Sequence, residues 1–220
     1  MKSQDFELYA DLKKFNTHIS PAWDTTFNEA LRCVGKMEAE VKLLDYGCGD
    51  GKYYKYWLDR GLSPEGIFGL ELSKKRVGRC HQIGWKNVLQ LAPQAPLPYG
   101  DSSFDVINCM EVIEHIPAEE GKRVIRELRR IIRPGGVLLI STPNYPVKRF
   151  YDCCDALLHQ KWVRLRDDPT HVTFFNHKRL TQLLGQHFTQ IEARPFKQGF
   201  LYKRFKHPTL LHKLFFLCRP

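Results

Sequence analysis

The chain has 220 residues, 34 lysines and arginines against 24 aspartates and glutamates, a formal net charge of +10, and seven cysteines. Its length suits one domain with a full hydrophobic core. No apolar run approaches the roughly 20 residues of a membrane-spanning helix, and the first residues lack the apolar core of a signal peptide. An odd number of cysteines with no C-x-x-C pair indicates reduced thiols, so we expect a cytoplasmic protein.

Aromatic residues are frequent in the first 32 residues. Trp23, Phe27 and Leu31 recur at helical spacing, and Ser20-Pro21 is typical of a helix start. From residue 42 onward, short apolar runs alternate with helical patterns, which predicts a parallel sheet with helices on both faces. The predicted strands are Lys42–Asp45, Ile67–Leu70, Val88–Leu91, Phe104–Cys109 and Val137–Ser141. The predicted helices are Lys52–Arg60, a segment from Ser73 to about Gly84, and Ala118–Arg133.

The last third of the chain is less regular. Residues 145–166 mix apolar and basic side chains, and we expect a helical insertion above the carboxyl ends of the strands. A helix is predicted at Leu180–Leu184, a strand at Phe188–Ala193 and a short apolar helix at Thr209–Leu217. No acid follows Glu192, so the chain ends in a basic tail, which either is a solvated face or meets an anionic partner.

The first predicted strand ends in Asp45 and leads into a turn with Gly47, Gly49 and Gly51. Glycines at such a turn let the backbone approach a ligand closely. The spacing matches neither the G-x-G-x-x-G dinucleotide fingerprint nor a phosphate-binding P-loop. Acids before the turn, within it and at the tip of the second strand (Glu71) would instead suit a cationic, phosphate-free adenosine ligand such as S-adenosylmethionine.

Four motifs in sequence order resemble those of the class I S-adenosylmethionine-dependent methyltransferases. They lie at residues 45–51 (Asp-Tyr-Gly-Cys-Gly-Asp-Gly), 69–73, 97–107 and 128–136. The resemblance implies an α/β fold with a doubly wound, mostly parallel, seven-stranded type of sheet. It also implies a single domain, residues 1–220. Its parts would be an N-terminal lid or helices (1–40), the cofactor-binding core (41–144), a cap insertion (145–172) and a C-terminal part with the basic tail (173–220).

The same resemblance implies which residues would hold S-adenosylmethionine. No acid follows the third strand, where many family members bind the adenine amino group, so Gln94 or backbone groups would take that role. The helix around Trp23 either packs over the cofactor as a lid or covers the sheet edge. The expected cofactor-binding residues are Asp45, Gly47, Cys48, Gly49, Gly51, Glu71, Leu72, Gln94, Cys109 and Met110.

Candidate catalytic residues follow the fourth strand and the insertion. We expect His171, His115 and Glu111 to face the methyl group, where a histidine could act as base on an acceptor hydroxyl. Residues 111–115 resemble ubiquinone-pathway and glycan or lipid O-methyltransferases, in which no metal is implied. They also resemble small-RNA 3′-terminal 2′-O-methyltransferases, in which two glutamates and two histidines hold a divalent metal. That alternative metal set would be Glu111, Glu114, His115 and His171.

The prediction is therefore a methyltransferase that O-methylates a small molecule, a glycan or a lipid-linked intermediate. The apolar insertion and the basic tail favour peripheral contact with an anionic membrane. Two alternatives stay open: a metal-dependent RNA 3′-terminal 2′-O-methyltransferase, and a non-catalytic methyltransferase-like scaffold. No RNA-binding module is visible, so we expect no nucleic-acid partner.

Overall fold

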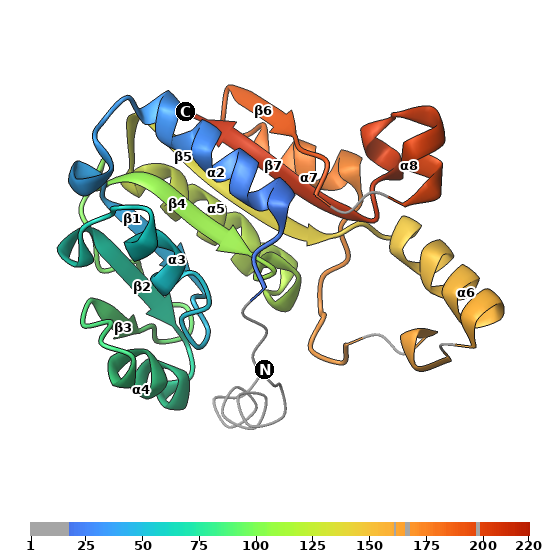
Figure 1. The fold of residues 1–220 in the computed structure, drawn as a ribbon, viewed down its shortest axis with the longest axis horizontal. Coiled ribbons are helices and arrows are strands. Elements are labelled where there is room, and N and C mark those ends of the chain that lie inside the picture. Colours follow the sequence, from blue (N-terminus) through green and yellow to red (C-terminus); the bar gives the residue numbers. More distant parts are fainter. Residues whose placement is uncertain (1–17, 161, 166–167, 197–198) are drawn as a thin grey trace.

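Seven strands form one sheet in the order β3-β2-β1-β4-β5-β7-β6 (Figure 1). The computed structural model describes residues 18–160, 162–165, 168–196 and 199–220. All strands are parallel to their neighbours except β7, which is antiparallel to both β5 and β6. The predicted mostly parallel sheet is thereby confirmed. The strands are β1 (Leu43–Tyr46), β2 (Ile67–Glu71), β3 (Val88–Gln90), β4 (Phe104–Met110), β5 (Ile132–Pro143), β6 (Gln190–Ala193) and β7 (Lys213–Arg219).

Helices cover both faces of this sheet, so its central strands are buried on both sides. Side chains alternate between two apolar clusters along each strand: Leu43 packs with α2, α3 and α4, whereas Leu44 packs with α5 and α7. These helices agree with the predictions, and Ser73 caps α4 by accepting a hydrogen bond from the Arg76 amide. Their bounds are α2 (Pro21–Val34), α3 (Tyr54–Asp59), α4 (Lys74–Gln82), α5 (Ala118–Ile131) and α7 (His177–Leu184).

Helix α2 lies across one face of the sheet, over β4 and β5 (Figure 1). Trp23 and Phe27 are buried there, and the Trp23 ring stacks on Tyr53 at 4.4 Å between centroids. The described part of the N-terminal segment therefore covers a face of the sheet rather than its edge. The remaining aromatic residues predicted to belong to this segment, Phe6, Tyr9 and Phe15, lie outside the described residues.

The predicted apolar helix at Thr209–Leu217 is wrong, because this segment enters the sheet as β7. Residues 214–218 are all buried, and their side chains alternate between the two faces. A short apolar run fits a buried helix and a central strand equally well, so periodicity could not separate them. The end of the basic tail is consequently part of the sheet: Arg219 pairs with Glu192 at 2.5 Å, and Lys213 pairs with Glu111 at 2.5 Å.

The insertion after β5 is helical, as predicted, and projects beyond the sheet in Figure 1. It contains α6 (Val147–His159) and a short 3₁₀ turn, η4 (Trp162–Leu165), and α8 (Phe200–Phe205) lies beside it. The Tyr151 hydroxyl joins the two helices by accepting a hydrogen bond from the Leu201 amide at 3.1 Å. Its role as a cap over the site stays a prediction. Among the described residues, no helix combines the length and the apolar character that a membrane span requires.

Candidate functional site

The glycine turn connects β1 to α3 at the carboxyl edge of the sheet. Its backbone folds back onto β2, since the amides of Gly47 and Cys48 both donate to the Leu70 carbonyl, at 2.8 and 3.1 Å. All three glycines have positive φ angles, with Gly47 at 74°. A Cβ atom on Gly47 would lie 2.5 Å from Cγ2 of Val112, so the turn requires glycine there for conformation and for space.

Glu71 holds the turn from the end of β2. One carboxylate oxygen accepts a hydrogen bond from the Gly49 amide at 2.9 Å, and the other accepts one from the Ser73 amide at 2.9 Å. The carboxylate therefore ties the glycine turn to the start of α4. Each oxygen keeps a second lone pair, so the same carboxylate retains acceptor capacity for a ligand.

Asp45 lies at the end of β1 and is only 2% exposed. One of its oxygens accepts a hydrogen bond from the Asn108 amide group at 2.7 Å, and Asn108 in turn accepts one from the Trp23 indole at 3.2 Å. The other oxygen, Oδ2, has no hydrogen-bond partner among the described residues. Burial raises the pKa of Asp45 to about 7, against the lowering effect of Asn108. A cationic group beside Oδ2 would satisfy it and favour the ionised form.

The other expected cofactor residues differ in how far their side chains are buried. The thiols of Cys48 and Cys109 are buried in the core, on opposite faces of the sheet, so only their backbones could meet a ligand. Gln94 is exposed at a positive φ of 63°, and Met110 is partly buried against the α2 face. The Leu72 carbonyl accepts a hydrogen bond from the Gln90 side chain at 3.2 Å. The structure thus gathers the expected set along the ends of β1, β2, β3 and β4.

Glu111 follows β4 directly, at a positive φ of 59°. It accepts a hydrogen bond from the Ser141 hydroxyl at 2.6 Å and pairs with the Lys213 ammonium at 2.5 Å. Burial raises the pKa of Glu111. The charge of Lys213 and the hydrogen bonds from Lys213 and Ser141 lower it by more, so the pKa lies below its usual value. Sequence reasoning missed Lys213 because it was placed in a helix instead of at the first position of β7.

A second ammonium lies near this pair. Burial lowers the pKa of Lys52, and the positive charge of Lys213 lowers it further, while Glu111 and Asp45 raise it. The end of β1 and the end of β4 therefore share two cations and two acids. Such a mixed set can accept a zwitterionic amino-acid group, whose ammonium and carboxylate need opposite partners.

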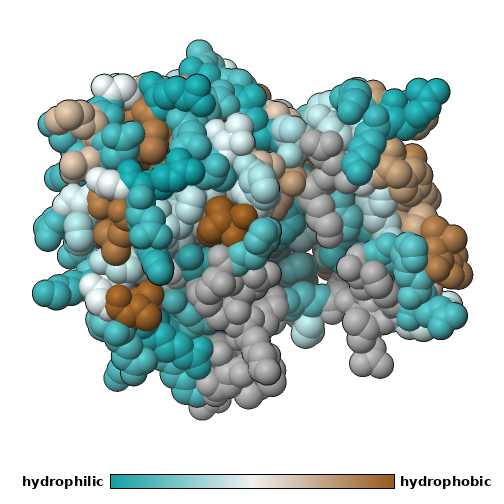
Figure 2. Space-filling view, viewed as in Figure 1, coloured by the Kyte–Doolittle hydropathy of each residue, from teal (hydrophilic) through white to brown (hydrophobic). Residues whose placement is uncertain are grey.

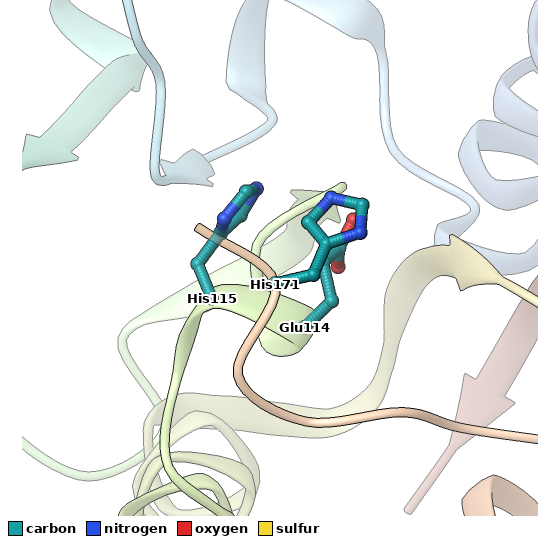
Figure 3. Close-up of side chains that lie close together, drawn as sticks. All are labelled: Glu114, His115 and His171. Carbon is teal, nitrogen blue, oxygen red and sulfur yellow. The ribbon is translucent and has the colours of Figure 1, made fainter. Parts of the chain in front are cut away.

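Glu114, His115 and His171 form a separate group, which we call the histidine–glutamate cluster (Figure 3). One potential ligand atom from each residue lies within 4.8 Å of the others, and the two imidazole centroids are 4.9 Å apart. Glu114 and His115 come from the short turn after β4, and His171 comes from the segment before α7. The Val172 and Thr173 amides donate to the Glu114 carbonyl at 2.9 and 3.0 Å, which joins the two segments. Three of the four residues of the alternative metal set thus meet, whereas Glu111 pairs with Lys213 instead.

Residues 44–140 match the model of a family described as a methyltransferase domain. A solved S-adenosylmethionine-dependent methyltransferase from Archaeoglobus fulgidus superposes with a TM-score of 0.60 at 14% identity, covering 90% of this chain and 94% of that one. The chain therefore has the fold of a class I methyltransferase, and residues 44–140 are similar to the methyltransferase-domain family.

The chain is also similar in sequence to curated O-methyltransferases. The chain is 35% identical over 115 residues to the ubiquinone biosynthesis O-methyltransferase of Idiomarina loihiensis, covering 49% of this chain and 44% of the relative. It is 31% identical over 123 residues to the 27-O-demethylrifamycin SV methyltransferase of Amycolatopsis mediterranei, covering 53% and 44% respectively. The matched part thus spans less than half the length of each of these relatives.

Proposed function

We propose that the protein is an S-adenosylmethionine-dependent methyltransferase that O-methylates a small molecule. The observation that carries this proposal is the pairing of two features at the ends of adjacent strands. An acid-lined glycine turn follows β1, and Glu114 and His115 follow β4, where His171 from the segment before α7 meets them. The first suits a cationic adenosine ligand, and the second suits an acceptor hydroxyl that must lose a proton.

The residues of the glycine turn fit the cofactor. Asp45 offers an unpartnered, buried carboxylate oxygen to the cofactor's ammonium, and Gly47 leaves the space that a side chain would fill. Glu71 stands at the position from which a strand-end acid reaches ribose hydroxyls. Lys52 supplies a cation for the amino-acid carboxylate. When bound, S-adenosylmethionine supplies a methyl group already activated by its sulfonium.

The protein's own part in the reaction is orientation and proton removal. Holding the acceptor oxygen in line with the methyl carbon and the sulfur converts a bimolecular step into a unimolecular one. As the oxygen–methyl bond forms and the sulfur–methyl bond breaks, the hydroxyl proton must leave. We assign its removal to His171, with His115 beside it and Glu111 held in place by Lys213.

Calorimetric titration of S-adenosylhomocysteine tests the cofactor site. We expect binding by the wild-type protein and its loss in Glu71→Ala, because that variant also releases the Gly49 and Ser73 amides. Glu65→Ala is the matched control, since Glu65 is an exposed acid that precedes β2 instead of following it. No binding by the wild type would refute the enzyme proposal.

For the acceptor we propose a lipid-linked or glycan intermediate at an anionic membrane surface. Large apolar side chains are exposed on the insertion: Leu157 is 71% exposed and Leu158 75%, with Phe200 and Phe205 on the neighbouring α8. Figure 2 shows apolar surface at the edge of the molecule formed by α6 and α8, next to hydrophilic patches. Apolar side chains flanked by cations such as Lys203 and Arg204 suit the interface of an anionic bilayer.

Flotation with vesicles of anionic or neutral phospholipid tests this surface. We expect the wild-type protein to float with anionic vesicles and the Leu157→Ser/Leu158→Ser variant to remain at the bottom of the gradient. The variant should bind S-adenosylhomocysteine as the wild type does. The matched control is Ile83→Ser, which removes an exposed apolar side chain on the opposite end of the sheet, beside α4. Equal flotation of all three proteins, or none by the wild type, would contradict the membrane proposal.

A further inference from the structure

We infer that Trp23 and Asn108 are positioning residues for the cofactor site: they fix one oxygen of Asp45 and leave the other for the ammonium group of the ligand. The three side chains form one chain of hydrogen bonds under helix α2. The inference deepens the proposed function and rests on it for the identity of the ligand. It is carried by three features: the register of β1 and β4, the orientation of the Asn108 amide group, and the packing of the Trp23 ring.

The strand register brings Asp45 and Asn108 together. β1 and β4 are neighbouring parallel strands, and Asn108 lies directly opposite Asp45. Leu43 and Val106, two residues before each of them, pack in the apolar cluster that includes α2. Since side chains two apart on a strand share a face, Asp45 and Asn108 also lie on that face. They are only 2% and 0% exposed, so their polar groups depend on partners from the protein or from a ligand.

The Asn108 amide group has only one orientation that suits both of its neighbours. The indole Nε1–H of Trp23 can only donate, so the amide oxygen faces it, at 3.2 Å. The amide nitrogen then faces Asp45 and donates to Oδ1 at 2.7 Å. A reversed amide would set N–H against N–H at Trp23 and oxygen against oxygen at Asp45, unless Asp45 were protonated and donated itself. Trp23 therefore selects the orientation in which Asn108 donates to the ionised form of Asp45.

The Trp23 ring is itself held in place by other aromatic rings. It is 1% exposed and stacks on Phe27 and Tyr53, with ring centroids 5.1 and 4.4 Å away. Tyr53 is the residue before α3, directly after the glycine turn. Helix α2 thus packs against the end of the turn and, through the Asn108 amide, sets the hydrogen bonding of Asp45.

The other titratable groups near Asp45 belong to the turn and to the strand ends. Burial raises the pKa of Asp45; the Asn108 hydrogen bond opposes this, Glu71 raises the pKa further and Lys52 lowers it. The remaining groups have raised pKa values and stay neutral between pH 6 and 8; they are Cys48, Tyr53 and Cys109. Changes at Asn108 or Trp23 leave all of these groups in the chain, so a shift in the titration of Asp45 would report the lost hydrogen bond.

Titration of Asp45 by NMR, followed at its carboxyl carbon, tests the inference without any ligand. We expect Asn108→Leu, which replaces the amide by an apolar side chain of similar size, to raise the pKa of Asp45 by about one unit. Trp23→Phe should raise it by less, because the amide then populates both orientations. The double variant should match Asn108→Leu, since the indole acts only through the amide. Binding of S-adenosylhomocysteine at pH 7 should weaken about fivefold in Asn108→Leu and recover as the pH rises.

Trp57→Phe is the matched control. Trp57 belongs to the same aromatic cluster and is fully buried, but its indole nitrogen has no hydrogen-bond partner among the described residues. This variant should lose similar packing and leave the titration of Asp45 unchanged.

Two results would overturn the inference: an unchanged pKa of Asp45 in Trp23→Phe, or an equal shift in Trp57→Phe. This pair of variants decides even where Asn108→Leu does not fold. Failure of the wild-type protein to bind S-adenosylhomocysteine would instead refute the proposed function, because the titration of Asp45 needs no ligand.

Discussion

The glycine turn and the histidine–glutamate cluster lie on the same edge of the sheet, but the carboxyl groups of Glu71 and Glu114 differ in their hydrogen bonds. In the turn, both oxygens of Glu71 accept hydrogen bonds from backbone amides of the chain itself. In the cluster, neither oxygen of Glu114 accepts one from a described residue. The first region is complete in its backbone before any ligand arrives. In the second, burial and the nearby charge of Glu111 raise the pKa of Glu114 well above its usual value, so its carboxyl group is held in the neutral form.

Asp45 stands between these two cases. One oxygen is bound by Asn108 and the other is unpartnered, so the turn keeps a single unsatisfied position for a ligand. The two regions therefore differ in preorganisation: the backbone of the turn is fixed by Glu71, whereas the Glu114 carboxyl group is not fixed by such hydrogen bonds. Changes to the turn should act through backbone geometry, and changes near the cluster should act through charge.

The largest effect is expected from Gly47→Ala. An alanine at this position would have to adopt a positive φ. Its Cβ atom would also meet Val112, whose branched side chain cannot easily move aside. We expect a loss of about 2–4 kcal/mol in the free energy of unfolding, measured by urea denaturation, together with loss of S-adenosylhomocysteine binding. Gly84→Ala is the control, since Gly84 has a φ of 86° but no atom within 4 Å of the added Cβ. It should cost only about 1–2 kcal/mol; equal losses would mean that contact with Val112 does not matter.

A smaller effect is expected from pH. Because the pKa of Asp45 is about 7 in the free protein, its carboxyl group is mostly protonated at pH 6 and mostly ionised at pH 8. A ligand ammonium stabilises the ionised form, so protonation competes with binding, and affinity falls as pH decreases through 7. We expect S-adenosylhomocysteine to bind roughly tenfold more weakly at pH 6 than at pH 8. The Asp45→Asn variant should show a flat profile; an equal pH dependence in that variant would assign the effect to another group.

The smallest effect is expected from Lys213→Met. This change removes the cation that pairs with Glu111, but the Glu111 side chain is 36% exposed, so solvent screens the pair. We expect a loss of about 1 kcal/mol in the free energy of unfolding, measured by urea denaturation at low salt and reduced at high salt. The double variant with Glu111→Gln should recover part of it. A loss several times larger would mean that Glu111 depends on Lys213 as strongly as a fully buried acid would.

Much of the turn could be predicted from local sequence. Gly47 and Glu71 were recognisable because they follow the ends of two apolar strands, and Ser73 was recognisable as a helix cap. The resemblance to class I methyltransferases then supplied the fold. What local sequence could not give was the direction of the thiols of Cys48 and Cys109, because a residue at a strand end can point into the core or toward the ligand.

The cluster was predictable only in part. Glu114 and His115 adjoin β4 and His171 follows the insertion, so their types were recognisable as possible ligands. Their meeting, and the exclusion of Glu111, depended on contacts such as that between His115 and Thr170, which lie 55 residues apart. The failed helix at Thr209–Leu217 has the same origin, since Lys213 reaches Glu111 only when that segment pairs with β5 as a strand.

The sequence by itself determined the alternation of strands and helices, the glycine turn and the acids that line it, because these depend on spacing within some 20 residues. Only the tertiary structure decided which polar groups are buried and which of them are hydrogen-bonded or ion-paired. It paired Glu111 with Lys213, closed Glu71 onto the turn, and left Asp45 and Glu114 with unsatisfied oxygens. The physical reason is that burial and hydrogen bonding are set by residues far apart in the chain, and these decide where a ligand gains most by binding.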